Sequence, residues 1–208
     1  MMPLILVIGP WGSGTTVVMQ ILSELGALVP TPHVVTFDER TPNSWETTAF
    51  NRFVGTVAAE DTTTLTQPEA ILPGLQVIHA ELQALSTSAQ RPIALKYALA
   101  ATILPQLSAV FALKLIYVTR PIEGIKATHA RRGWYRHLGP EGAIRIQKYM
   151  AEYAAQAKHP IHRVHFPDLI ERPSQLISEL AAFVSLPDRP SAQQVVRRSP
   201  DTQGAYYS

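Results

Sequence analysis

The sequence of 208 residues has no cysteine, few charged residues (16%) and no long apolar run. The lack of cysteine excludes disulfides, cysteine-ligated zinc sites and a thiol nucleophile. The apolar run at residues 3–8 is too short to cross a membrane, and neither a charged leader nor a cleavage site accompanies it. Because 46% of the residues are hydrophobic, a disordered chain is also excluded. We expect a folded cytoplasmic protein without a membrane partner.

Charge is unevenly distributed, although the net value is only +2. Residues 1–109 contain four Lys or Arg and eight Asp or Glu, a net charge of −4, whereas residues 110–208 contain fourteen and eight, a net charge of +6. The small total argues against a nucleic-acid binder. The basic second half fits either a small anionic ligand held by a few arginines or an unevenly charged surface. The length fits one domain over residues 1–208, and nothing in the sequence indicates an oligomeric state.

Buried apolar runs alternate with helical stripes along the chain. Continuous apolar segments predict strands at residues 4–8, 92–95, 113–118 and 161–166. Helical spacing predicts helices at residues 18–25, 47–58, 75–85, 141–158 and 174–184, and a further helix that ends near Pro105. Residues 30–44, which contain three prolines, are expected to form a loop. This alternation predicts an α/β protein with a central parallel sheet flanked by helices.

The segment Gly9–Thr16, with the sequence Gly-Pro-Trp-Gly-Ser-Gly-Thr-Thr, joins the first expected strand to the first expected helix. A glycine-rich turn there directs backbone N–H groups to one place, and the helix dipole adds positive charge, so the segment is expected to bind phosphate. Gly9 and Gly14 have the spacing of a nucleoside-triphosphatase loop, but Thr15 replaces the lysine that this motif requires. Hydrolysis of ATP or GTP is therefore disfavoured.

The run Ser13-Gly14-Thr15-Thr16 after the first strand resembles the 5′-phosphosulfate loop of sulfotransferases, which use 3′-phosphoadenosine 5′-phosphosulfate (PAPS). The resemblance implies a three-layer P-loop-like fold, release of adenosine 3′,5′-bisphosphate, and no required metal. It also implies that the backbone from Gly12 to Thr16 and the two threonine hydroxyls hold the 5′-phosphate and the sulfonate. The family usually has lysine or arginine before the serine, whereas this chain has Gly12 and so lacks that cation.

Arg120 follows the strand expected at 113–118 and precedes Pro121, which favours the start of a helix. The carboxyl edge of a parallel sheet is where such folds bind ligands, and arginine can hold a phosphate with two hydrogen bonds. In sulfotransferases this turn has an arginine and, eight positions later, a serine that contact the 3′-phosphate. Arg120 and Thr128 have that spacing. In relatives, basic residues near the C-terminal end of the domain contact the same phosphate, so Arg197 and Arg198 are candidates for this contact too. The alternative is that both arginines lie on the solvated surface.

Transfer of a sulfonate to an acceptor is helped by a general base within hydrogen-bond reach of the acceptor. Trp45-Glu46 resembles a Trp-Glu segment of a bacterial branch of the family, so Glu46 is the first candidate for the base. Asp38, Glu39 and His33 lie in the same region and remain alternatives. His79 lies on an apolar helical stripe, which favours a place in the core.

Lys96, at the end of the strand expected at 92–95, matches the lysine of a Lys-Asp-Pro-Arg segment in the same branch. The resemblance implies positive charge near the sulfonate, partly replacing the cation missing at Gly12. The segment 131–136, which contains three arginines, fits a lid or a contact for an anionic acceptor. We expect a PAPS-dependent sulfotransferase acting on a hydroxyl or amine of a small-molecule acceptor. The alternatives are a Mg²⁺-dependent small-molecule kinase with a degenerate loop and a nucleotide-binding protein without catalysis.

Overall fold

The computed structural model describes residues 1–208 except 37, 39–40, 59–64, 66, 134–138 and 199–208. Its main sheet has four parallel strands in the order β4-β1-β5-β6. These strands are β1 (Pro3–Ile8), β4 (Ile93–Lys96), β5 (Ala112–Thr119) and β6 (Ile161–His165). All four strands were predicted from the sequence, and the expected parallel α/β sheet is confirmed.

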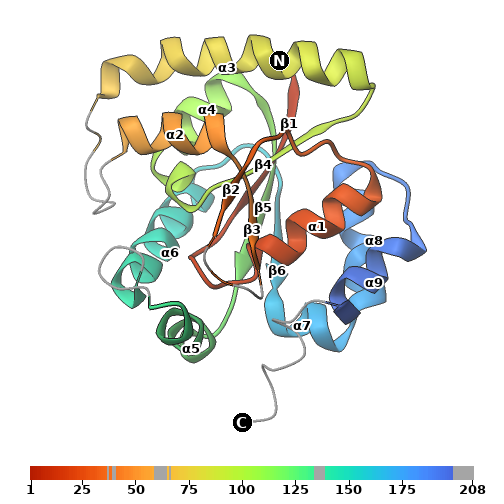
Figure 1. The fold of residues 1–208 in the computed structure, drawn as a ribbon. Coiled ribbons are helices and arrows are strands. Elements are labelled where there is room, and N and C mark those ends of the chain that lie inside the picture. The colour runs from red at the N-terminus through yellow and green to blue at the C-terminus, as the bar shows by residue number, and fades with distance from the viewer. Residues whose placement is uncertain (37, 39–40, 59–64, 66, 134–138, 199–208) are drawn as a thin grey trace.

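Helices cover both faces of this sheet, so the fold has three layers (Figure 1). Along β1, Leu4, Leu6 and Ile8 face one core cluster, and Ile5 and Val7 face the other, as the two-residue period of a strand requires. Because both faces are buried, β1 has no polar residue. The first cluster is closed by α2 (Thr48–Val57), α3 (Pro68–Ala89), the short 3-10 helix η1 (Ala98–Ile103), α4 (Leu104–Val110) and α6 (Pro140–Ala154).

The second cluster is closed by α1 (Thr15–Leu25), α7 (Phe166–Glu171), α8 (Pro173–Val184) and α9 (Pro190–Arg198). The first helix ends where the sequence predicts, because Gly26 adopts a left-handed conformation with φ of 114° and its N–H bonds back to Leu22 O. Within the described part of the chain, no helix is both long and apolar enough to cross a membrane.

Two expectations about local structure are wrong. Residues 30–44 were expected to be a loop, but they contain β2 (His33–Val35) and the start of β3 (Asn43–Thr47), which pair antiparallel. Pro105 was expected near the end of a helix, but it lies in the first turn of α4. The first turn of a helix tolerates proline because its N–H would have no partner there in any case.

The parallel strands end at one edge of the sheet, at the bottom of Figure 1, and α3 lies at the opposite edge. The Gly9–Thr16 segment leaves β1 at this carboxyl edge, Lys96 ends β4, and Arg120 follows β5. The helix α5 (Ile122–Arg132) also starts here. The topology therefore places residues from distant parts of the sequence at the edge where open α/β sheets bind ligands.

Candidate nucleotide and sulfonate site

The Gly9–Thr16 segment, called the phosphate loop below, depends on glycine at two positions. Gly12 and Gly14 have φ of 85° and 98°, in the left-handed region that other residues rarely adopt. A Cβ atom on Gly14 would also lie 2.1 Å from the ring of Phe166, at the start of α7. Gly14 caps the N-terminus of α1, so this conformation turns the chain from β1 directly into the helix.

Three carbonyl groups of the phosphate loop accept hydrogen bonds. Pro10 O accepts from Ser13 N at 3.0 Å, Trp11 O from His129 Nε2 at 2.6 Å, and Gly12 O from Arg120 Nη1 at 3.1 Å. Among the described residues, no backbone carbonyl accepts from the N–H groups of these loop positions: Gly12, Gly14, Thr15 and Thr16. Donors without backbone partners at a helix N-terminus form a site for an anion.

The Ser13 side chain is a second indication of an anion site. Ser13 is fully buried, and its Oγ has no hydrogen-bond partner among the residues that the structure describes. A buried hydroxyl without a partner costs free energy of about 1–3 kcal/mol. An anionic ligand in the phosphate loop would supply the missing acceptor.

Lys96 brings a positive charge to the phosphate loop from β4. Its Nζ donates to Thr16 Oγ1 at 3.1 Å and to Ser44 O at 2.6 Å, and forms an ion pair with Glu46 Oε1 at 3.3 Å. The two charged side chains are only 7% and 12% exposed. Burial lowers the pKa of Lys96, and the neighbouring Glu46 carboxylate opposes that shift.

Glu46 is held by β3 and α2 together. Ser44 Oγ bonds to Val34 O on β2 and accepts the Glu46 N–H, while Trp45 between them has a left-handed φ of 60°. Asn51 Nδ2, from α2, donates to Glu46 Oε2 at 2.9 Å. Each carboxylate oxygen of Glu46 therefore has one donor, and each retains lone pairs that can accept a proton.

Arg120 and Thr128 meet on the other side of the phosphate loop. Arg120 Nη1 lies 3.3 Å from Thr128 Oγ1 as well as donating to Gly12 O, and its guanidinium carbon is 4.9 Å from the centre of the Phe166 ring. Gly124 makes room for this conformation, because a Cβ there would lie 2.6 Å from Arg120 Nε. The predicted pair is therefore brought to the phosphate loop.

No protein-family model matches the chain, and no curated protein sequence matches it. Several solved structures do match. The sulfotransferase domain from the curacin biosynthetic pathway superposes with a TM-score of 0.62 at 18% identity, over 94% of this chain and 78% of that one. The sulfotransferase domain from the Synechococcus PCC 7002 olefin synthase gives 0.62 at 16% identity, over 99% and 80%.

Sulfotransferase STF1 from Mycobacterium tuberculosis H37Rv has a TM-score of 0.52 at 16% identity, over 100% of this chain and 72% of its own. The chain has the sulfotransferase fold. At such low identity the likeness concerns the fold, and it confirms the three-layer P-loop-like arrangement expected from the Ser13-Gly14-Thr15-Thr16 resemblance.

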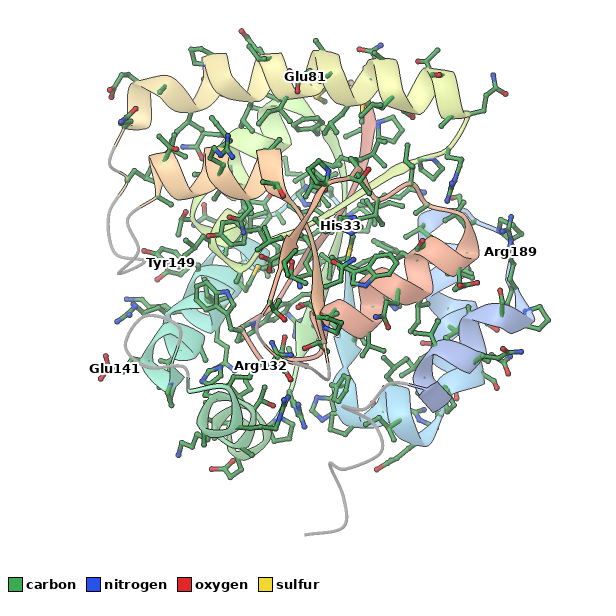
Figure 2. All side chains as sticks on the ribbon, viewed as in Figure 1. His33, Glu81, Arg132, Glu141, Tyr149 and Arg189 are labelled. Carbon is green, nitrogen blue, oxygen red and sulfur yellow. The ribbon has the colours of Figure 1, made fainter. Side chains whose placement is uncertain are left out.

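Asp38, an alternative candidate for the base, has different partners from Glu46. Asp38 accepts hydrogen bonds from Arg131 Nη1 at 2.9 and 2.8 Å, lies 2.6 Å from Arg132 Nε, and accepts from Thr41 Oγ1 at 3.0 Å. Arg132 also donates to Thr41 Oγ1. Figure 2 shows Arg132 reaching from the end of α5 toward β2 and β3. Asp38 is thus bound to the first two arginines of the predicted lid segment, and the remainder of that segment, 134–136, lies outside the described residues.

Other candidates lie away from the phosphate loop or outside the described part. His33 stacks on Trp45, with ring centres 5.4 Å apart, and its Nδ1 lies 2.9 Å from Asn43 Nδ2. His79 packs on Phe111, the residue before β5, at the amino edge of the sheet. Glu39 is not among the described residues, and the side chains of Arg197 and Arg198, at the end of α9, are not described either.

Sequence reasoning missed His129 and Asn51. His129 follows Thr128 directly and bonds to the phosphate loop, but no motif in the sequence marks it. Asn51 lies on the predicted helix at 47–58, and its place beside Glu46 depends on how β3 turns into α2. Only proximity in sequence, to Thr128 and to Glu46, could have drawn attention to them.

Proposed function

We propose that this protein is a PAPS-dependent sulfotransferase that transfers a sulfonate to a hydroxyl or amine of a small-molecule acceptor. The observation that carries the proposal is the position of the buried Lys96–Glu46 pair, whose ammonium bonds to Thr16 in an anion-binding loop. A cation and a candidate base beside a phosphate loop fit group transfer better than simple binding. The sulfotransferase fold supports the same choice.

The residues of the phosphate loop fit the 5′ end of this donor. Among the described residues, the N–H groups of Gly12, Gly14, Thr15 and Thr16 have no backbone acceptor, and the buried Ser13 hydroxyl has no partner. Arg120 and Thr128 are the proposed contacts of the 3′-phosphate, since they meet beside Gly12. Late basic residues at the end of α9 remain a further proposal for that phosphate: Arg197 and Arg198.

When bound, PAPS supplies an activated sulfonate whose sulfur bonds to the acceptor oxygen or nitrogen as its bond to the bridging oxygen breaks. Glu46 accepts the proton of the acceptor, using a carboxylate held in place by Lys96 and Asn51. The Lys96 ammonium provides positive charge near the transferred group. The family cation expected at position 12 is absent, so we propose that Lys96 carries more of this task here.

Calorimetric titration with adenosine 3′,5′-bisphosphate tests the proposal. We expect saturable binding in the presence of EDTA, because the phosphate loop and Arg120 supply the counter-charges without a metal. The same titration with ATP, with and without Mg²⁺, is the comparison. Mg²⁺-dependent binding of ATP with no binding of the bisphosphate would favour a kinase and overturn the proposal. Binding of the bisphosphate without detectable transfer to any acceptor would favour a non-catalytic protein.

Arg120→Ala is expected to weaken binding of adenosine 3′,5′-bisphosphate by about 10–100-fold, as loss of a charge-assisted hydrogen bond to phosphate would do. Titration with adenosine 5′-monophosphate, which has no 3′-phosphate, provides the comparison ligand. Its affinity should change much less, because it lacks the phosphate that Arg120 is proposed to bind.

Arg172→Ala is a matched control, since Arg172 pairs with Asp168 on the exposed surface of α7. It should leave both affinities unchanged. An equal loss of both ligands in Arg120→Ala would show that the 3′-phosphate site lies elsewhere.

A further inference from the structure

His129 on α5 contacts the phosphate loop from outside it. The residue is only 2% exposed, and its Nε2 lies 2.6 Å from the carbonyl oxygen of Trp11. A carbonyl oxygen can only accept a hydrogen bond, so Nε2 carries a proton and donates it. The contact joins residues 118 positions apart in the sequence.

This hydrogen bond controls the direction of a backbone donor in the phosphate loop. The carbonyl of Trp11 and the N–H of Gly12 belong to one planar trans peptide group, so they point in opposite directions. Fixing Trp11 O toward His129 therefore fixes the Gly12 N–H on the opposite side. Arg120 holds the next carbonyl, that of Gly12, in the same way, and Ser13 N returns to Pro10 O.

Glycine at position 12 makes this contact possible. A Cβ atom on Gly12 would lie 3.3 Å from His129 Nε2 and 3.2 Å from both Cβ and Cγ2 of Thr128. Such distances are tight, and φ at Gly12 is already left-handed. The Thr128 and His129 side chains of α5 thus occupy the space next to position 12. A lysine or arginine at position 12 would compete with His129 for that space, so glycine there and the buried histidine go together.

We propose that His129 is a positioning residue of the phosphate loop, whose Nε2–H bond to Trp11 O aims the Gly12 N–H at the bound 5′ anion. The identity of that anion, the phosphosulfate end of PAPS, rests on the proposed function, whereas the effect on the loop does not. His129 does not contact the transferred group in this role. It acts through the backbone of Trp11 and Gly12.

The surroundings of His129 favour a neutral hydrogen-bond donor over a cation. Burial lowers the pKa of His129, the bond to Trp11 O opposes this shift, and the positive charge of Arg132 lowers the pKa further. Arg120, which bonds to the adjacent carbonyl, adds a second positive charge on this side of the loop. A neutral side chain that donates from the Nε2 position should therefore replace histidine.

Two measurements on His129 variants test the proposal. In His129→Gln, an amide nitrogen takes roughly the place of Nε2 and can donate to Trp11 O, whereas in His129→Leu there is no donor. In His129→Asn the side chain stays polar but is too short to reach Trp11 O. It is a second variant without the hydrogen bond, and it can be used if the leucine variant does not fold. Hydrogen–deuterium exchange of the Gly9–Thr16 amides in the unliganded protein measures the order of the loop. Calorimetry with adenosine 3′,5′-bisphosphate measures binding.

We expect exchange in Gly9–Thr16 to become about three- to tenfold faster, and the bisphosphate affinity to fall by a similar factor, in the leucine and asparagine variants. Glutamine should restore both. His79→Leu, on the far edge of the sheet, is the control for loss of a partly buried histidine and should change neither.

Equal behaviour of the glutamine and leucine variants, whether both normal or both impaired, would overturn the positioning role. A wild-type protein that does not bind the bisphosphate would instead overturn the proposed function, and the exchange rates would still decide the role of His129.

Discussion

Glu46→Gln is expected to lower the turnover number by about two to four orders of magnitude, the range that a positioned general base contributes. Glutamine has nearly the same shape, and its carbonyl oxygen can still accept from Lys96. Its NH2 group can donate to Asn51 once the Asn51 amide turns its oxygen toward position 46, so the site should keep its geometry. An amide cannot take up the acceptor proton. The affinity for adenosine 3′,5′-bisphosphate should therefore stay within about twofold of the wild type.

The measurement is transfer of labelled sulfonate from PAPS to a fixed panel of phenols, alcohols and amines, compared with calorimetry on the same samples. Asp38→Asn is the matched control. Asp38 forms ion pairs with Arg131 and Arg132 and accepts a hydrogen bond from Thr41. These partners occupy its carboxylate, so Asp38 is poorly placed to act as the base. Unchanged turnover in Glu46→Gln would remove Glu46 from this role, and a larger loss in Asp38→Asn would transfer the role to Asp38.

The main sheet was predictable because its strands are buried on both faces. Runs such as Leu4–Ile8 are apolar without interruption, and the sequence shows this without any knowledge of neighbours. The antiparallel pair of β2 and β3 was not predictable in this way. His33 pairs with Thr47 and Val35 with Asn43. These strands are short and partly exposed, so they depend on pairing with each other, which the sequence of either strand does not show.

The candidate site, like the fold, was predictable only in part. The sequence indicated the phosphate loop and Arg120 because they follow strands of a parallel sheet, and it indicated Lys96 by resemblance to a Lys-Asp-Pro-Arg segment. The structure brings all three together at one edge. Glu46 lies in β3, one residue before the end of that strand, and its ion pair with Lys96 depends on a strand that the sequence did not indicate. The bond from His129 to Trp11 O spans 118 residues and leaves no trace in periodicity or spacing.

Lys96→Met is expected to lower the free energy of unfolding by about 3–5 kcal/mol, because it leaves the buried Glu46 carboxylate without its counter-ion. The three N–H donors of the Lys96 ammonium match three acceptors: Glu46 Oε1, Ser44 O and Thr16 Oγ1. Methionine has a similar length but none of these donors. For a chain of this size the loss corresponds to a fall in Tm of roughly 6–20 °C, measured by calorimetry or circular dichroism.

The double variant Glu46→Gln/Lys96→Met separates the stability of the pair from its chemistry. Without the carboxylate, no unpaired charge stays buried, so we expect the double variant to recover most of the stability lost in Lys96→Met. Its turnover should stay as low as that of Glu46→Gln, since both the base and the cation near Thr16 are gone. Additive losses of stability in the two single variants would show that Lys96 and Glu46 do not interact. Recovery of turnover together with stability would show that the pair supports the fold and takes no part in transfer.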